Sequence, residues 1–102
     1  MNFPEEYTCH GVPVTIEIVR NLNDESKLAY YSTVSGRPRI VARDSMPVRL
    51  KELTLAHEVL HSWFHFSGVT NTMPEGQEEL FCDAVAPLLV EFMKTVVKEN
   101  QN

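Results

Sequence analysis

The sequence is poor in cysteine: only Cys9 and Cys82 are present, far apart in the chain and outside any CxxC pattern. Two isolated cysteines form neither a disulfide scaffold nor a cysteine-rich zinc module, and we expect both thiols to be reduced. Long apolar runs are also missing, and none approaches the roughly 20 residues that cross a bilayer. The first residues show neither the basic nor the apolar part of a secretory signal. We therefore expect no membrane partner and a cytoplasmic location.

Basic residues are scarce as well. Lys and Arg number 9 against 14 Asp and Glu, which gives a net charge of −5 and a pI near 5.3. Binding to a phosphate backbone needs a basic surface that releases counterions, so we expect no nucleic-acid partner. The chain does have 102 residues that are 43% hydrophobic and 23% charged, which is typical of a single globular domain with one small core.

Strand patterns occupy the first half of the chain. β-Branched residues alternate along residues 12–19, Tyr, Thr and Val fill residues 28–34, and residues 39–43 form a third, shorter run. Short gaps between consecutive runs predict an antiparallel meander, because a parallel crossover needs a dozen or more residues. Pro38 and the alternating arginines of residues 39–43 predict an edge strand there.

Helical patterns occupy the second half. Residues 48–66 follow Pro47 and are apolar nearly all round, which predicts a central, buried helix. Residues 77–99 predict a second helix, with a kink or break at Pro87. The expected fold is therefore α+β in a single domain, residues 1–102. A three-stranded meander in residues 1–47 packs on the first helix, and a loop and the second helix follow in residues 67–102.

The first helix contains the pattern H-E-x-x-H, formed by His57, Glu58 and His61. Residues four apart on an α-helix differ by about 40° in azimuth and about 6 Å in height, so both imidazoles can bind one ion. Zinc accepts imidazole nitrogens at about 2.0–2.1 Å. Glu58, about 100° further round, is placed to hold a metal-bound water. The pattern predicts a Zn²⁺ cofactor; the alternative is two core histidines satisfied by backbone carbonyls beside a surface glutamate.

A catalytic zinc needs a third protein ligand and one open position. His65 is two turns from His57, about 12 Å along the axis, which is too far for one ion. We expect it to support the site or simply to pack. The extended pattern H-E-x-x-H-x-x-G-x-x-H also fails, because Phe64 and Ser67 occupy the Gly and third His positions. The third ligand must therefore come from another element.

The second helix offers candidate ligands. Glu79 and Asp83 are four residues apart and share one face. We predict that Glu79 is the third ligand and that Asp83 accepts a hydrogen bond from the non-metal nitrogen of His57 or His61. Glu78 is the alternative third ligand. Acidic residues near a helix N-terminus also have a purely structural explanation, because they interact favourably with the helix dipole.

These two blocks resemble a known family. Residues 54–61 (TLAHEVLH) and 79–86 (ELFCDAVA) are similar to the "TLAHELGH" and "E-x-x-A-N-x-F-A" helices of ImmA/IrrE-like metallopeptidases. The wider pattern resembles the gluzincin class, and the length resembles single-domain minigluzincins. Departures from the family pattern are Leu60 for Gly, Asp83 for Asn and Val85 for Phe.

The resemblance extends over roughly residues 28–90. It implies a small zincin-like core, with residues 39–43 at the family's edge strand. It also implies a zinc endopeptidase that acts on a peptide or protein substrate, often a regulatory protein.

The motif predicts peptide hydrolysis by a metal-bound water, with Glu58 as general base. Strand 39–43 is expected to align an extended peptide by β-addition, its arginines favouring acidic segments; a solvated strand face is the alternative. A developing oxyanion needs a further hydrogen-bond donor. The candidates for oxyanion or substrate contacts are Tyr30, Tyr31, His10, His65, Arg37 and Arg39.

Two other interpretations concern the use of the site. The protein could be a non-catalytic module with a structural or vestigial zinc site, which binds a partner protein without cleaving it. Cys9 and His10 could instead fold onto the zinc and keep an enzyme latent. Because few residues remain after His61, we expect a shallow, open site that is completed by a homodimer, a partner protein or an extended substrate.

Overall fold

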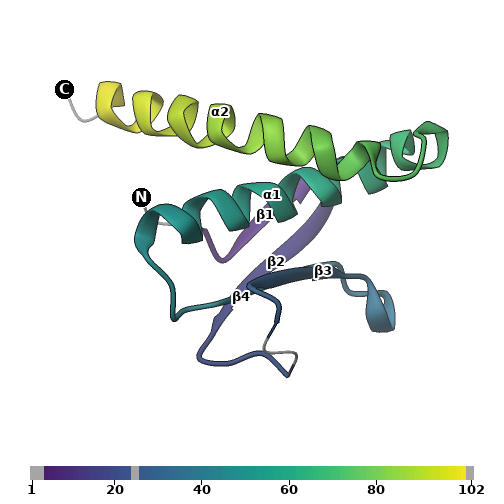
Figure 1. The fold of residues 1–102 in the computed structure, drawn as a ribbon, viewed down its shortest axis with the longest axis horizontal. Helices are drawn as coiled ribbons and strands as arrows, with labels where there is room; N and C mark the ends of the chain where they lie inside the picture. Colours follow the sequence, from purple (N-terminus) through teal and green to yellow (C-terminus); the bar gives the residue numbers. More distant parts are fainter. Residues whose placement is uncertain (1–3, 24–25, 101–102) are drawn as a thin grey trace.

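The structure is a computed structural model that describes the backbone of residues 4–23 and 26–100, with side chains up to residue 96. It combines a sheet with two long helices (Figure 1). The elements in chain order are β1 Glu6–Cys9, β2 Val12–Val19, β3 Ala29–Ser32, the 3-10 turn Val34–Gly36, β4 Arg39–Arg43, α1 Val48–Ser67, the 3-10 turn Val69–Thr72 and α2 Gln77–Asn100.

The sheet has four strands in the order β1-β2-β4-β3. β1 and β2 are antiparallel, β2 and β4 are parallel, and β4 and β3 are antiparallel. The α+β class is confirmed, but the three-stranded meander is wrong. The prediction considered only consecutive strands, whereas residues 20–38 together are long enough for the crossover that places β4 beside β2.

Strand β1 was not predicted. It has only four residues and joins β2 through a tight turn at His10 and Gly11, whose φ angles are 50° and 79°. Positive φ at both central residues is typical of a two-residue hairpin turn. Gly11 was the local signal for this hairpin, but β1 was too short to show a strand period.

Strand β4 lies inside the sheet, so its prediction as an edge strand is also wrong. Ile40 and Ala42 are fully buried and Val41 is 3% exposed. Both backbone edges of β4 are paired, and an added peptide cannot bind there. The outermost strands are β1 and β3, and β3 is the one that lies beside the candidate site.

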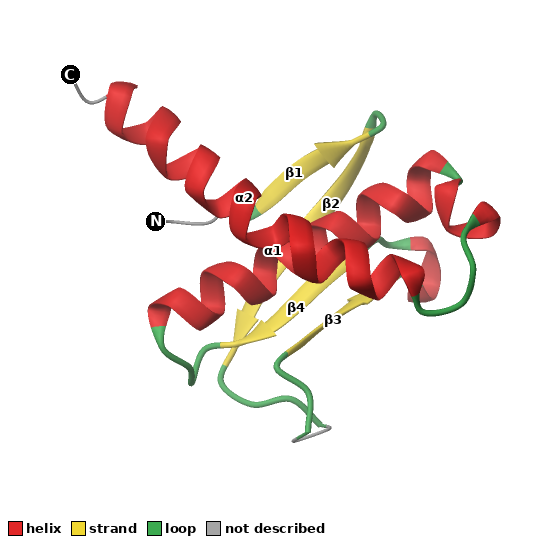
Figure 2. Ribbon diagram, turned by 45° about the horizontal axis from the view of Figure 1, so that its top comes forward, coloured by secondary structure: helices red, strands yellow, loops and turns green. Residues whose placement is uncertain are grey.

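Helix α1 lies between the sheet and α2 (Figures 1 and 2). One face packs on the sheet through Leu55, which joins Val14, Ile16 and Ile40 in the main core. The opposite side packs on α2 in a second cluster of Ala56, Ala86 and Val90. The central position predicted for this helix is therefore confirmed, although parts of its surface remain open to solvent.

Helix α2 is continuous through Pro87, so that residue does not mark a break. Within the described residues, no helix combines the length and apolarity that a bilayer span requires.

An ion pair between a buried carboxylate and a half-exposed lysine joins the two helices. Glu52 on α1 is 1% exposed, and its Oε1 atom lies 2.8 Å from Lys94 Nζ on α2. The hydrogen bond from Lys94 lowers the pKa of Glu52, and this effect outweighs the opposing effect of burial. A second pair, Arg49 to Glu91 at 3.8 Å, also joins the helices but is exposed. Surface pairs of this kind contribute little to stability.

The first prediction concerns the pair of Glu52 with Lys94. Lys94→Met should lower the free energy of unfolding by roughly 1–3 kcal/mol at pH 7, because it removes the main cation beside a buried carboxylate. The folded-state pKa of Glu52 is depressed, so the pair contributes above the unfolded-state pKa and its contribution is lost as pH falls through the folded value. Urea unfolding at several pH values measures this loss. The matched control Arg49→Met should cost under about 1 kcal/mol. Equal losses in the two variants would contradict the prediction.

Candidate metal centre

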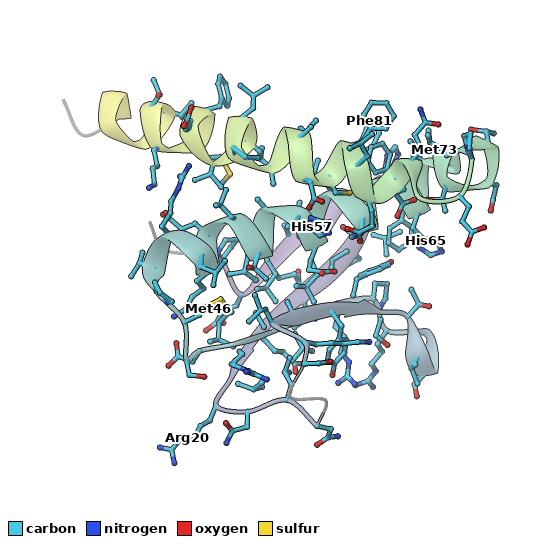
Figure 3. All side chains as sticks on the ribbon, in the orientation of Figure 1. Arg20, Met46, His57, His65, Met73 and Phe81 are labelled. Atoms are coloured by element: carbon cyan, nitrogen blue, oxygen red, sulfur yellow. The ribbon has the colours of Figure 1, made fainter. Side chains whose placement is uncertain are left out.

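The centre of the site is formed by two imidazoles on successive turns of α1. The Nε2 atoms of His57 and His61 lie 3.0 Å apart. Both side chains are largely buried, with 19% and 17% of their surface exposed. Figure 3 shows His57 at the junction of α1 and α2. The one-turn spacing of the motif therefore brings the two ring nitrogens together, as an ion held by both would require.

Glu79 on α2 completes a triangle with these nitrogens. Its Oε1 atom lies 2.7 Å from His61 Nε2 and 3.2 Å from His57 Nε2. A tetrahedral zinc with ligands at about 2.0–2.1 Å holds them about 3.3 Å apart. The three donors thus fit a zinc ion after shifts of a few tenths of an ångström. They are close enough to bind one metal ion.

Each imidazole is held on its outer nitrogen by a carboxylate. Asp83 Oδ1 lies 3.0 Å from His57 Nδ1, and Glu78 Oε2 lies 2.5 Å from His61 Nδ1. Thr70 Oγ1 in turn donates a hydrogen bond to Glu78 Oε1, at 2.5 Å. Such partners fix the tautomer and orientation of ligand histidines. The structure therefore places Asp83 on His57, and it places Glu78 behind His61 rather than among the inward-facing donors.

The charges of these groups are coupled. Burial lowers the pKa of His61, but its hydrogen bonds to Glu78 and Glu79 outweigh burial and raise the pKa above its usual value. Burial raises the pKa of Glu79, but hydrogen bonds from the two histidines leave it lower overall. Each group therefore favours the charged form of the other. A metal ion bound here would compete with protons for these donors.

Cys82 is a further donor that the sequence analysis did not consider as a ligand. Its side chain is fully buried on α2, and its Sγ atom lies within 4.8 Å of ring nitrogens of His57 and His61. Burial, with the charges of Glu78 and Glu79, raises the pKa of the thiol to about 12. Its position three residues after Glu79 was the available signal, because residues three apart share a helix face.

Glu58 lies between two surface hollows that together form a groove beside β3. Both hollows are lined by Ala29 and Glu58. The hollow on the His57 side, of about 390 Å³, is mostly apolar and includes Leu28, Leu50, Leu53, Ala86 and Pro87. The hollow on the His61 side, of about 490 Å³, is lined mainly by residues with polar side chains, and we call it the polar hollow. They include Lys27, Tyr30, Tyr31, His65 and Thr70.

Burial raises the pKa of the Glu58 carboxyl, although the two histidines oppose this effect. A raised pKa suits a group that must accept and then return a proton.

Tyr31 and His65, two of the residues predicted to contact an oxyanion or the substrate, meet in the polar hollow. The Tyr31 hydroxyl lies 3.0 Å from His65 Nδ1, and burial raises the pKa of Tyr31. Tyr30 lines the same hollow. His65 is thus brought to the groove without joining the inward-facing donors.

The other residues predicted to contact the oxyanion, the substrate or the zinc lie outside the groove. The His10 ring contacts Trp63, with centroids 5.0 Å apart, and the Cys9 thiol donates a hydrogen bond to the Ser62 carbonyl at 3.8 Å. The hairpin turn that carries them is therefore not brought to the metal-site residues. Arg37 and Arg39 line a separate hollow with Glu17 on the sheet.

Comparisons with protein-family models, curated proteins and solved structures found no match.

The second prediction concerns the carboxylate behind His57. Asp83→Ala should weaken zinc binding about 10–100-fold, because the ring then loses its orienting partner. Competition with a chromogenic chelator measures the affinity. Glu75→Ala removes an exposed acid next to α2 and is the matched control, for which we expect no comparable loss. Identical affinities of the two variants would show that the Asp83 contact is irrelevant to metal binding.

Proposed function

We propose that the protein is a zinc-dependent metallopeptidase that hydrolyses bonds in peptide or protein substrates. The observation that carries this proposal is the position of Glu79. Its carboxylate contacts the inward Nε2 atoms of both histidines of the H-E-x-x-H helix. Glu58, the acid of the same motif, lies in the adjoining groove. Three converging donors beside an accessible carboxyl group form the constellation that hydrolysis assisted by a metal requires.

The roles of the residues follow from their places. His57, His61 and Glu79 would hold the ion, which when bound supplies a Lewis acid and lowers the pKa of water. Glu58 accepts the proton of the attacking water and returns it to the leaving amine. Asp83 and Glu78 keep the two imidazole rings in the tautomer that presents Nε2 inward.

The polar hollow supplies hydrogen-bond donors. A Tyr31 hydroxyl that donates to His65 Nδ1 leaves the proton of the neutral imidazole on Nε2. His65 can then donate a hydrogen bond to a substrate oxygen in this hollow, where Tyr30 offers a second hydroxyl.

Strand β3 is the proposed binding edge for substrate. Among the residues that the structure describes, it pairs with β4 on one side only, and it ends the sheet beside the groove. Its Ala29, Tyr30 and Tyr31 line the polar hollow. An extended peptide can add to the free edge of β3 through backbone hydrogen bonds. Strand β3 therefore takes the place of strand 39–43 as the proposed site of β-addition, because both edges of strand 39–43 are already paired.

A non-catalytic metal-binding module is the second candidate, and Cys82 is the observation that favours it. A buried thiol near both histidines offers a donor set of two nitrogens and one sulfur. Thiolate ligation is common in structural zinc sites, which leave no position open. If the protein is such a non-catalytic module, Glu58 has no catalytic role.

The third prediction separates the two candidates. Glu58→Gln should retain stoichiometric zinc, measured by elemental analysis, and should lose at least about 100-fold in peptide cleavage, because general-base catalysis is removed. Cleavage is followed by mass spectrometry with a peptide library. Glu75→Gln makes the same chemical change outside the groove and should cleave like the unaltered protein. Undiminished cleavage by Glu58→Gln would rule out the proposed mechanism.

The fourth prediction identifies the third ligand. Cobalt(II)-substituted protein should show no thiolate-to-cobalt charge-transfer band in the near ultraviolet, because Glu79 supplies an oxygen. Cys82→Ser should leave that spectrum unchanged, whereas Glu79→Ala should alter the visible bands of the ion. A charge-transfer band that disappears in Cys82→Ser would instead support the non-catalytic candidate.

A further inference from the structure

The outer side of α2, away from α1, carries a line of apolar side chains. The exposed fractions of Leu80, Leu88 and Phe92 are 67%, 66% and 64%, and that of Val96 is 39%. Phe81, 42% exposed, lies beside this line, and Figure 3 shows it on the side of α2 that is turned away from α1. With the exposed Ala84, residues at intervals of four form what we call the outer ridge: Leu80, Ala84, Leu88, Phe92 and Val96.

The size of this surface matches that of a protein interface. Aromatic side chains of this kind bury about 150–250 Å² each, and large aliphatic ones somewhat less, so these exposed fractions amount to roughly 500 Å² of apolar area per chain. That is at the upper end of the largest patch on a typical monomer. Because an interface is about 55–65% apolar, 500 Å² corresponds to about 800 Å² in total on each partner. A stable two-protein interface of standard size buries about that much per partner.

The pattern of the ridge favours a second copy of the same helix. Ridges formed by residues four apart pack into the matching grooves of another helix at about −50°, the commonest crossing in globular proteins. A twofold axis on the outer side of α2, between Ala84 and Leu88, would place small Ala84 of one chain opposite large Leu88 of the other, and the reverse. It would likewise place Leu80 opposite Phe92. The ridge is therefore complementary in size to itself.

The metal centre lies on another side of α2. Glu79 and Asp83 contact His57 of α1, whereas the ridge side chains are exposed. A second chain on the ridge would leave the groove beside β3 open. We propose that two copies of the chain form a twofold-symmetric dimer through their outer ridges. This inference is independent of the proposed peptidase function.

Sedimentation equilibrium of the full chain between about 1 and 500 μM tests the proposal. The unaltered protein should show a concentration-dependent monomer–dimer equilibrium. Leu88→Glu should raise the dimer dissociation constant at least about tenfold, because it places a charge in the apolar centre. Val34→Glu is the matched control: Val34 is 70% exposed, lies far from α2 in sequence, and should leave the dissociation constant unchanged.

A double variant tests the register. Ala84→Lys alone should weaken the dimer, whereas Ala84→Lys combined with Leu88→Glu should recover part of the loss, because the new opposite charges face each other across the twofold axis. Circular dichroism checks that each variant is folded. A protein that stays monomeric over the whole range, or a dimer that Leu88→Glu and Phe92→Glu both leave intact, would overturn the proposal. Capture of a different partner by a monomeric protein would do so as well.

Discussion

The packing of α2 on α1 is the contact on which the candidate site depends. Small and medium side chains, Ala56, Ala86 and Val90, bring the two helices close together. The pair of the buried Glu52 with Lys94 holds them further along the helices. Because the histidines lie on α1 and Glu79 lies on α2, the donor triangle exists only while this contact persists. Metal affinity and helix packing should therefore be coupled, since an ion that binds only the folded arrangement also stabilises it.

A second constraint comes from the sheet. The parallel pairing of β2 with β4 sends β3 to the outside, so that an open strand edge borders the groove. The lining residues of the groove are mainly polar beside His61 and mainly apolar beside His57, and Glu58 lines both parts. Two helices and a single strand thus bring candidate metal donors, the Glu58 carboxyl group and an outer strand edge together in a small chain. In this architecture α2 contributes its inner side to the metal centre, while its outer side remains available for association.

Local features of the structure were predictable from the sequence, whereas pairings between distant segments were not. The predicted helices 48–66 and 77–99 agree with α1 and α2 to within one residue at each end, because their apolar period and boundary residues are local signals. Helical spacing alone also selected Glu79 and Asp83, which the structure brings to the histidines. Strand order depends on pairing between distant segments, and the short β1 left no periodic signal. Spacing places Cys82 on the same face as Glu79, but the rotation of α2 against α1 decides how Glu78, Glu79 and Cys82 each meet the histidines. Spacing within one helix cannot predict that rotation.

The most direct test of the account is a crystal structure of the zinc-loaded protein, with anomalous data collected on both sides of the zinc absorption edge. The account predicts one anomalous peak at the junction of α1 and α2. That peak should lie about 2.0–2.2 Å from the Nε2 atoms of His57 and His61 and from a carboxylate oxygen of Glu79, with a remaining position open toward the groove. A peak coordinated by Cys82 in place of Glu79, or no peak at the histidines in protein that carries stoichiometric zinc, would contradict it.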